Sequence, residues 1–157
     1  MSDDTPLPRD TRHALPMALL RAREAVMTRF RPMLAAHDIN EQQWRVIRVL
    51  GEVDRLDATE VAVRANILAP SLTRMIRAMT ERGLIHRARD ASDGRRVMLS
   101  IAPQGRALLQ VVAPDSTAIY QQLEHDYGAA RTAQLIDMLI ALADLAEPRA
   151  ERPADSN

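Results

Sequence analysis

The chain has 157 residues, 46% of them apolar and 27% charged, which suffices for one domain with a hydrophobic core or a small domain with helical extensions. Its 21 basic and 21 acidic residues give zero formal net charge, so overall charge favours no class of partner. Cysteine is absent, which excludes disulfides, zinc-thiolate sites and thiol redox sensing. The N-terminus lacks a signal-peptide pattern, and no apolar stretch reaches the ~20 residues of a membrane span, so we expect a soluble, cytoplasmic protein.

The first helical pattern follows a tail, residues 1–11, that we expect to be disordered. Pro16 suits the first turn of a helix that extends to about His37, and Pro32 is expected to kink or weaken it. Its apolar stripe consists of Leu15, Leu19, Ala22, Val26, Phe30 and Met33.

Three further helices are predicted in the next part of the chain. Asn40, with Gln43 three residues later, is expected to cap a helix that ends near Gly51. Residues 56–67 indicate a short third helix, and residues 71–82 a fourth. The apolar face of the fourth helix comprises Leu72, Met75, Ile76 and Met79.

A β-hairpin follows the fourth helix. Residues 83–90 and 95–102 alternate as short strands do, and Asp93-Gly94 joins them. The order helix, helix, short helix, helix, hairpin is typical of a winged helix-turn-helix. The sequence therefore predicts a mainly α fold in which residues 39–102 form a winged helix-turn-helix DNA-binding region with a two-stranded wing.

Two long helical patterns complete the chain. One starts near Pro103 and is broken at Gly128, an amphipathic helix follows to residue 146, and residues 147–157 are expected to be disordered. These helices and the first one cannot all bury their apolar stripes on a small winged domain. We therefore expect residues 12–38 and 103–146 to form dimerisation helices with a second copy of the chain.

The fourth helix has a basic outer face. Pro70, Thr73, Arg74 and Arg77 lie opposite its apolar residues at helical spacing. Residues 64–96 contain eight arginines and three acids, a net charge of +5 within a neutral chain. A solvated arginine-rich surface is the alternative explanation. The position beside a predicted turn and wing favours major-groove contact, where arginine reaches guanine edges and threonine a thymine methyl or a phosphate.

Residues 67–105, ILAPSLTRMIRAMTERGLIHRARDASDGRRVMLSIAPQG, resemble the MarR-type transcription regulators. In that family this region carries the recognition helix, a Gly-Leu-Ile entry to the wing, and a wing of Asp-x-Arg type closed by a helix-opening glycine. The resemblance extends over residues 12–146, and residues 18–50 look most like the repressors of homoprotocatechuate (4-hydroxyphenylacetate) degradation operons. Ala102 departs from the threonine usual in the family, at a helix cap.

The resemblance implies a homodimer that places two recognition helices about one DNA turn apart on a palindromic operator in double-stranded DNA. It aligns Arg95 with the wing arginine that enters the minor groove. Arg96 is expected to touch backbone phosphates, and Asp93 to hold an arginine in place. The DNA-binding residues that we predict are Pro70, Ser71, Thr73, Arg74, Arg77, Asp93, Arg95 and Arg96.

Arg23 lies within or at the edge of the apolar stripe of the first helix, where a charge needs a partner. One kind of partner is a protein carboxylate: the partner subunit's Glu24, or Glu124 or Asp126. The other is the carboxylate of an aromatic ligand, which a guanidinium binds with two hydrogen bonds. The resemblance implies an effector site between the dimerisation helices and the winged domain, in a cleft lined by the first two helices.

Three further residues are candidates for that cleft. Met27 and Trp44 offer apolar walls, with core packing as the alternative. Arg45 either pairs with Glu41 one helical turn away or turns into the cleft. We predict that Arg23, Met27, Trp44 and Arg45 bind a small aromatic carboxylic acid.

The sequence shows no pattern typical of a catalytic or metal site. His13, His37, His86 and His125 are spread singly, which favours structural or surface roles. We therefore predict no enzyme activity, no cofactor and no metal. The predicted function is that of a ligand-released repressor of an aromatic-acid catabolic operon. The alternatives are a MarR-type activator, a repressor of another catabolic or efflux operon, and a dimerisation module that does not bind DNA.

Overall fold

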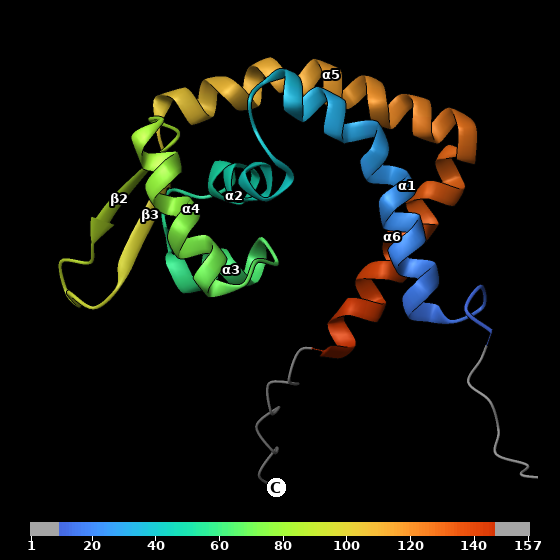
Figure 1. Ribbon diagram of the computed structural model, residues 1–157, viewed down its shortest axis with the longest axis horizontal. Helices are drawn as coiled ribbons and strands as arrows, with labels where there is room; N and C mark the ends of the chain where they lie inside the picture. The colour runs from blue at the N-terminus through green and yellow to red at the C-terminus, as the bar shows by residue number, and fades with distance from the viewer. Residues whose placement is uncertain (1–9, 147–157) are drawn as a thin grey trace, which may run out of the picture. The chain divides into compact units, whose positions relative to one another are not determined.

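The computed structural model describes residues 10–146 (Figure 1). The chain divides into two compact units, Met1–Ser116 and Thr117–Asn157. The predicted disordered tails lie outside the described residues, apart from Asp10 and Thr11, which begin an exposed turn. The elements are α1 (Leu15–Ala36), α2 (Glu41–Gly51), β1 (Leu56–Asp57), α3 (Ala58–Arg64), α4 (Ala69–Glu81), β2 (Ile85–Arg89), β3 (Val97–Ile101), α5 (Pro103–Tyr127), α6 (Ala129–Ala143) and the 3-10 turn η1 (Asp144–Ala146).

Helix α1 begins with a proline in its first turn, as predicted. Pro32, where we expected a kink or a weak point, lies inside the helix and does not end it. Phe30, Met33 and Leu34 are buried on either side of this position. Their packing explains why the missing amide does not end the helix, because tertiary burial outweighs the loss of one helical hydrogen bond.

The predicted cap of α2 is confirmed in detail. The Asn40 side chain accepts a hydrogen bond from the Gln43 backbone N–H (2.8 Å), and the Gln43 side chain accepts one from the Asn40 N–H (3.1 Å). This reciprocal capping box satisfies two donors at the helix start. The helix then buries Val46, Ile47 and Leu50.

The sheet has three strands where we predicted two. Leu56 and Asp57, expected to be helical, form β1 and pair antiparallel with β3 opposite Leu99 and Met98. The strand order is β1-β3-β2. Helix α3 starts only at Ala58, with the Asp57 side chain accepting from a backbone N–H of its first turn. Pairing with a strand far along the chain decides the conformation of these two residues, and helical periodicity cannot reveal that pairing.

The wing is the predicted hairpin with a broader tip. Strands β2 and β3 pair from Ile85 opposite Ile101 to Arg89 opposite Val97, and they lie side by side next to α4 (Figure 1). Residues 90–96 connect them. Among residues 10–146, the glycines with positive φ are Gly83 and Gly128, so Gly94 is not left-handed. The Arg96 N–H donates to the Asp93 carbonyl (3.0 Å), which closes a β-turn centred on Gly94 and Arg95 within the longer loop.

Helix α4 buries the four apolar residues that the sequence predicted, Leu72, Met75, Ile76 and Met79. Gly83, at φ +70°, then turns the chain into β2. The carbonyl of Leu84 accepts from the Ala102 N–H (3.0 Å), which joins the start of the wing to the start of α5. The order and character of the elements confirm the mainly α winged helix-turn-helix fold.

The second unit contains the end of α5 and all of α6. Gly128, at φ +102°, breaks the helical pattern as predicted. Helix α6 leaves most of its apolar side chains exposed in the single chain; these are Leu135, Ile136, Met138, Leu139, Ile140 and Leu142. In the part of the chain that the structure describes, no helix is both long and apolar enough to cross a membrane.

Two glycines provide a test of the packing between the wing and α5. A Cβ on Gly105 would lie 2.2 Å from the Leu84 carbonyl oxygen, whereas a Cβ on Gly94 would meet nothing within 4 Å. We expect Gly105→Ala to lower the free energy of unfolding by about 1–3 kcal/mol, because backbone must move, and Gly94→Ala to leave it nearly unchanged. Urea unfolding of both variants measures the difference, and equal stability would show that this contact is not tight.

Candidate nucleic-acid interface

The outer face of α4 presents the predicted recognition residues together. Pro70, Thr73, Arg74 and Arg77 are exposed, and Ser71 is half-buried. The helix starts after Leu68, which is 78% exposed and provides no side-chain cap. The exposed face of α4 is therefore apolar at its start, at Leu68 and Pro70, and basic one turn later, at Arg74 and Arg77. Arginines at this position can reach the edges of bases in a major groove.

The Thr73 hydroxyl is engaged within the helix. It donates a hydrogen bond to the Ala69 carbonyl oxygen at 3.1 Å. Because the hydroxyl proton is used there, this rotamer cannot donate to a phosphate. The thymine methyl, the other contact that we predicted for Thr73, suits the exposed threonine methyl better.

The two arginines of this face differ in their partners. Arg77 Nε lies 2.9 Å from Glu81 Oε1, one turn further along α4, and the Arg77 side chain is 85% exposed. Among residues 10–146, the Arg74 guanidinium has no hydrogen bond or ion pair. Arg74 can therefore contact DNA without giving up a protein partner, whereas Arg77 must leave or share a carboxylate. Because the ion pair of Arg77 with Glu81 is exposed, it contributes only about 0.2–1 kcal/mol to stability.

The two arginines of the wing loop, Arg95 and Arg96, also differ in whether their guanidinium groups have a protein partner. Within the described chain the Arg95 guanidinium has no protein partner. The Asp93 side chain accepts from the Arg95 backbone N–H (3.1 Å), and the Asp93 carbonyl accepts from the Arg96 N–H (3.0 Å). Asp93 therefore shapes the loop through main-chain bonds, whereas we expected it to hold a guanidinium.

Arg96 points back to the protein. Its guanidinium donates to the carboxylate of Asp57, whose other oxygen accepts from the Glu60 N–H (2.8 Å) at the start of α3. The bond from Arg96, followed by the one from Glu60, holds the pKa of Asp57 below its usual value. Asp57 is a residue that the sequence did not single out, because its partner lies in a distant strand.

A second group of charges, the α1–α2 arginine cluster, lies where these helices meet and comprises Arg23, Glu24, Arg31, Glu41 and Arg45. Within the described chain, Arg23 pairs with Glu41 of α2, a partner that we had not considered for it. Arg31 donates to Glu24 through both of its Nη atoms, and its Nε lies 3.6 Å from Glu41 Oε2. Glu41 is only 21% exposed, so α1 and α2 share a half-buried carboxylate.

Arg45 is the member of this cluster without a counter-ion. Its Nε is buried and has no hydrogen-bond partner within residues 10–146. Burial, followed by repulsion from Arg23, lowers the pKa of Arg45. Of the two arrangements considered for Arg45, the pair with Glu41 is therefore absent from the described chain. Trp44 and Met27 are half-buried.

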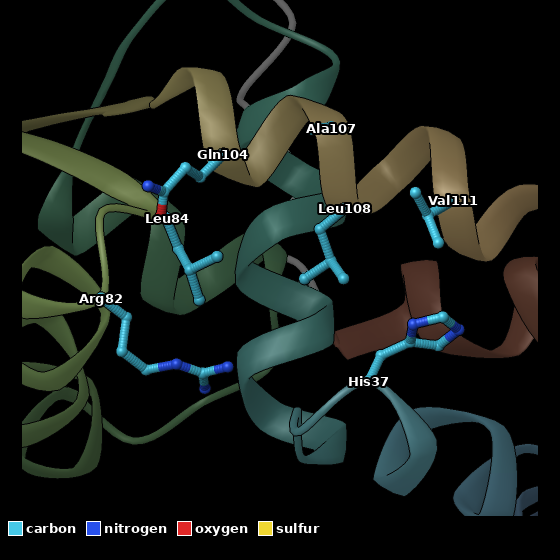
Figure 2. A pocket seen from close by; sticks show the side chains of 7 residues that line it. All are labelled: His37, Arg82, Leu84, Gln104, Ala107, Leu108 and Val111. Atoms are coloured by element: carbon cyan, nitrogen blue, oxygen red, sulfur yellow. The ribbon is translucent and has the colours of Figure 1, made fainter.

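An open pocket of about 360 Å³ lies elsewhere in the first unit. It is lined by His37, Arg82, Leu84, Gln104, Ala107, Leu108 and Val111. Figure 2 shows Gln104, Leu108 and Val111 along α5, with His37 and the Arg82 guanidinium on the opposite side. None of the four predicted ligand residues lines this pocket, so it is a separate candidate for a ligand.

The basic outer face of α4 and the arginine of the adjoining wing are those of a winged helix-turn-helix DNA-binding protein. The MarR family profile matches residues 37–96. The chain is 37% identical over 138 residues to the homoprotocatechuate degradative operon repressor of Escherichia coli, which covers 88% of this chain and 93% of that protein. The chain belongs to the MarR family of transcription regulators.

Two solved structures are similar along nearly the whole chain. NadR in complex with 4-hydroxyphenylacetate has a TM-score of 0.75 and 36% identity, over 92% of this chain and 100% of that one. CouR, a transcriptional repressor bound to a 23-mer DNA duplex, has a TM-score of 0.78 and 28% identity, over 88% of this chain and 99% of that one. The first similarity is to a ligand complex and the second to a DNA complex.

The pair between Arg77 and Glu81 predicts that Glu81 weakens DNA binding. Glu81→Gln removes a negative charge from the face of α4 and frees Arg77, so we expect about two- to fivefold tighter binding to duplex DNA. Fluorescence anisotropy at two salt concentrations measures this. The control is Glu60→Gln, since Glu60 forms the same kind of pair with Arg64 (2.9 Å) on α3. Weaker binding by Glu81→Gln would mean that Glu81 orients Arg77 for the DNA.

Because the Arg95 guanidinium has no partner within the described chain, we predict that removing it strongly weakens DNA binding. Arg95→Ala should weaken binding by about 1–3 kcal/mol and lower the salt slope by about 1, because a contact with the groove and its phosphates is lost. The loss should be greatest on sites whose flanks are rich in A·T pairs, where the minor groove is narrow. Arg12→Ala, an exposed change of equal charge, is the control. Unchanged affinity would remove the wing tip from the interface.

Proposed function

We propose that this MarR-family regulator is a cytoplasmic, non-catalytic homodimer that represses an aromatic-acid catabolic operon and is released from a palindromic operator by a small aromatic carboxylic acid. The single observation that carries the effector assignment is Arg45, whose buried Nε has no hydrogen-bond partner within residues 10–146 and whose charge is opposed by that of Arg23. A half-buried guanidinium whose buried Nε has no hydrogen-bond acceptor is destabilising, and a ligand carboxylate would supply the acceptor.

The charge of the α1–α2 arginine cluster supports an anionic ligand. Its three arginines face two glutamates, which leaves an excess of one positive charge. Glu24 and Glu41 are already engaged with Arg31 and Arg23. A carboxylate bound at Arg45 would neutralise the cluster, and the half-buried Trp44 ring beside it in sequence would suit the apolar body of an aromatic acid.

The names of similar proteins support the chemical class. One relative is a repressor of homoprotocatechuate degradation, and NadR was solved with 4-hydroxyphenylacetate. Both compounds combine an aromatic ring with one carboxylate, and a guanidinium without a counter-ion would bind that carboxylate. For this chain, we therefore place a phenolic or phenylacetic acid at Arg23, Met27, Trp44 and Arg45.

The exposed apolar side chains of α6 support the homodimer. Leu135, Ile136, Leu139 and Leu142 lie at helical spacing and are exposed in the single chain. A contiguous apolar stripe of this kind is stable in water only when another surface covers it. A second copy, related by a two-fold axis, would cover this stripe and present two α4 helices to DNA.

Release of the DNA requires that the ligand distinguish two states of the dimer. A ligand that binds better when the recognition helices are wrongly spaced for adjacent major grooves shifts the population toward that state. The same ligand site would regulate an activator if the operator lay at a position where the bound dimer helps RNA polymerase to start transcription. The position of the operator relative to the promoter decides between these two forms of regulation.

The effector assignment is tested by titrating 4-hydroxyphenylacetate and homoprotocatechuate into a complex of the protein with its operator, obtained by selection from random duplexes. We expect release at sub-millimolar to millimolar ligand, and loss of the response in Arg45→Ala with operator affinity retained, because Arg45 belongs to the α1–α2 arginine cluster and not to the predicted DNA-binding residues. A complex indifferent to both ligands would refute this effector class.

The control for this experiment is Arg82→Ala, which alters the wall of the separate pocket. If the ligand binds at the α1–α2 arginine cluster, Arg82→Ala keeps the wild-type response. If the ligand occupies the pocket instead, Arg82→Ala loses the response and Arg45→Ala keeps it. That second result would preserve the regulatory function and overturn the ligand residues.

A further inference from the structure

The contact between Arg96 and Asp57 joins three elements of the winged domain. Asp57 ends β1, caps α3 through the Glu60 N–H (2.8 Å), and accepts from the guanidinium of Arg96 at the base of the wing loop. Its side chain is 19% exposed, whereas that of Arg96 is 53% exposed. One carboxylate therefore serves both the helix-turn-helix and the wing.

The backbone of Arg96 is held as firmly as its side chain. The Arg96 N–H donates to the Asp93 carbonyl and the Arg96 carbonyl accepts from the Asp90 N–H, both at 3.0 Å. With its main chain bonded on both sides of the loop, Arg96 has one remaining freedom, which is the direction of its guanidinium. That direction is toward Asp57, whereas the guanidinium of the adjacent Arg95 has no partner within the described residues.

The other charges at this point favour the same arrangement. Asp90 and Asp93 also attract Arg96, although more weakly than Asp57 does. Asp90 is itself held by Ser92, whose N–H (2.9 Å) and hydroxyl (2.8 Å) both donate to it. Arg96 thus faces three carboxylates of its own chain, so moving it to a DNA phosphate would leave Asp57 without its cation.

We infer that Arg96 is a positioning residue that fixes the wing to the start of α3 through Asp57, and that it contributes to DNA binding by holding Arg95 in place and not by contacting a phosphate. The inference rests on the proposed DNA-binding function and assigns Asp57, far from the wing tip, a part in operator affinity. It replaces the phosphate contact that we expected for Arg96.

The test uses Arg96→Ala, Asp57→Asn and the double variant in the full-length protein. Asparagine caps a helix about as well as aspartate, so Asp57→Asn removes the charge that holds Arg96 while keeping the cap of α3. Binding is measured on a duplex that the wild-type protein selects from a random pool, at several salt concentrations. Arg95→Ala provides the reference for an arginine that touches DNA.

If Arg96 acts through Asp57, each single variant and the double variant weaken operator binding by the same factor, about three- to tenfold, because the wing must be ordered on binding. The salt slope then stays at the wild-type value. If Arg96 contacts a phosphate, Arg96→Ala lowers the slope by about 0.9, and Asp57→Asn tightens binding because it frees Arg96. Tighter binding by Asp57→Asn would overturn the inference.

A measurement without DNA separates this inference from the proposed function. Backbone order parameters of residues 90–96, measured by NMR relaxation, should fall in both single variants relative to wild type. If the wild-type protein selects no DNA sequence, the proposed function fails while this measurement still tests the contact. If the wild type selects an operator and loop order is unchanged in both variants, the positioning role alone is wrong.

Discussion

The burial of one face of α4 determines which side chains the protein offers to DNA. Leu72, Met75, Ile76 and Met79 are each at most 8% exposed, and burying side chains of this size contributes about 1.5–3 kcal/mol apiece. Rotating the helix by a single residue, about 100°, would expose several of them together. The helix therefore has one stable rotation about its axis, and that rotation directs Arg74 outward.

The function of each arginine follows from the group that its guanidinium meets. Every cation here other than histidine is arginine, and the chain is neutral overall, so neither residue type nor net charge distinguishes DNA contacts from structural ones. Glu81 and Asp57 make that distinction by engaging Arg77 and Arg96. An exposed pair such as the one with Glu81 is easily exchanged for a phosphate, whereas a carboxylate that also caps a helix is not.

Features set by local spacing could be predicted from the sequence, and those set by distant pairing could not. The capping box of Asn40 and the buried face of α4 depend on residues three or four apart, where helical geometry alone decides the contact. Asp57 and Arg96 are 39 positions apart, and β1 exists only because it pairs with β3. For the same reason, the Arg23 partner Glu41, on the next helix, was missed.

The position of the α1–α2 arginine cluster gives effector binding a physical route to the DNA-binding face. Helix α2 packs on α3 and on β3, and β3 carries the wing and pairs with the strand that contains Asp57. An anion at Arg45 would compete with Glu41 for Arg23 and so change the charge that joins α1 to α2. Because packed elements move as units, a shift of α2 would reach α3 and the sheet together. The contact of Arg96 with Asp57 would then carry the wing along with the helix-turn-helix, so that one ligand displaces both DNA contacts at once.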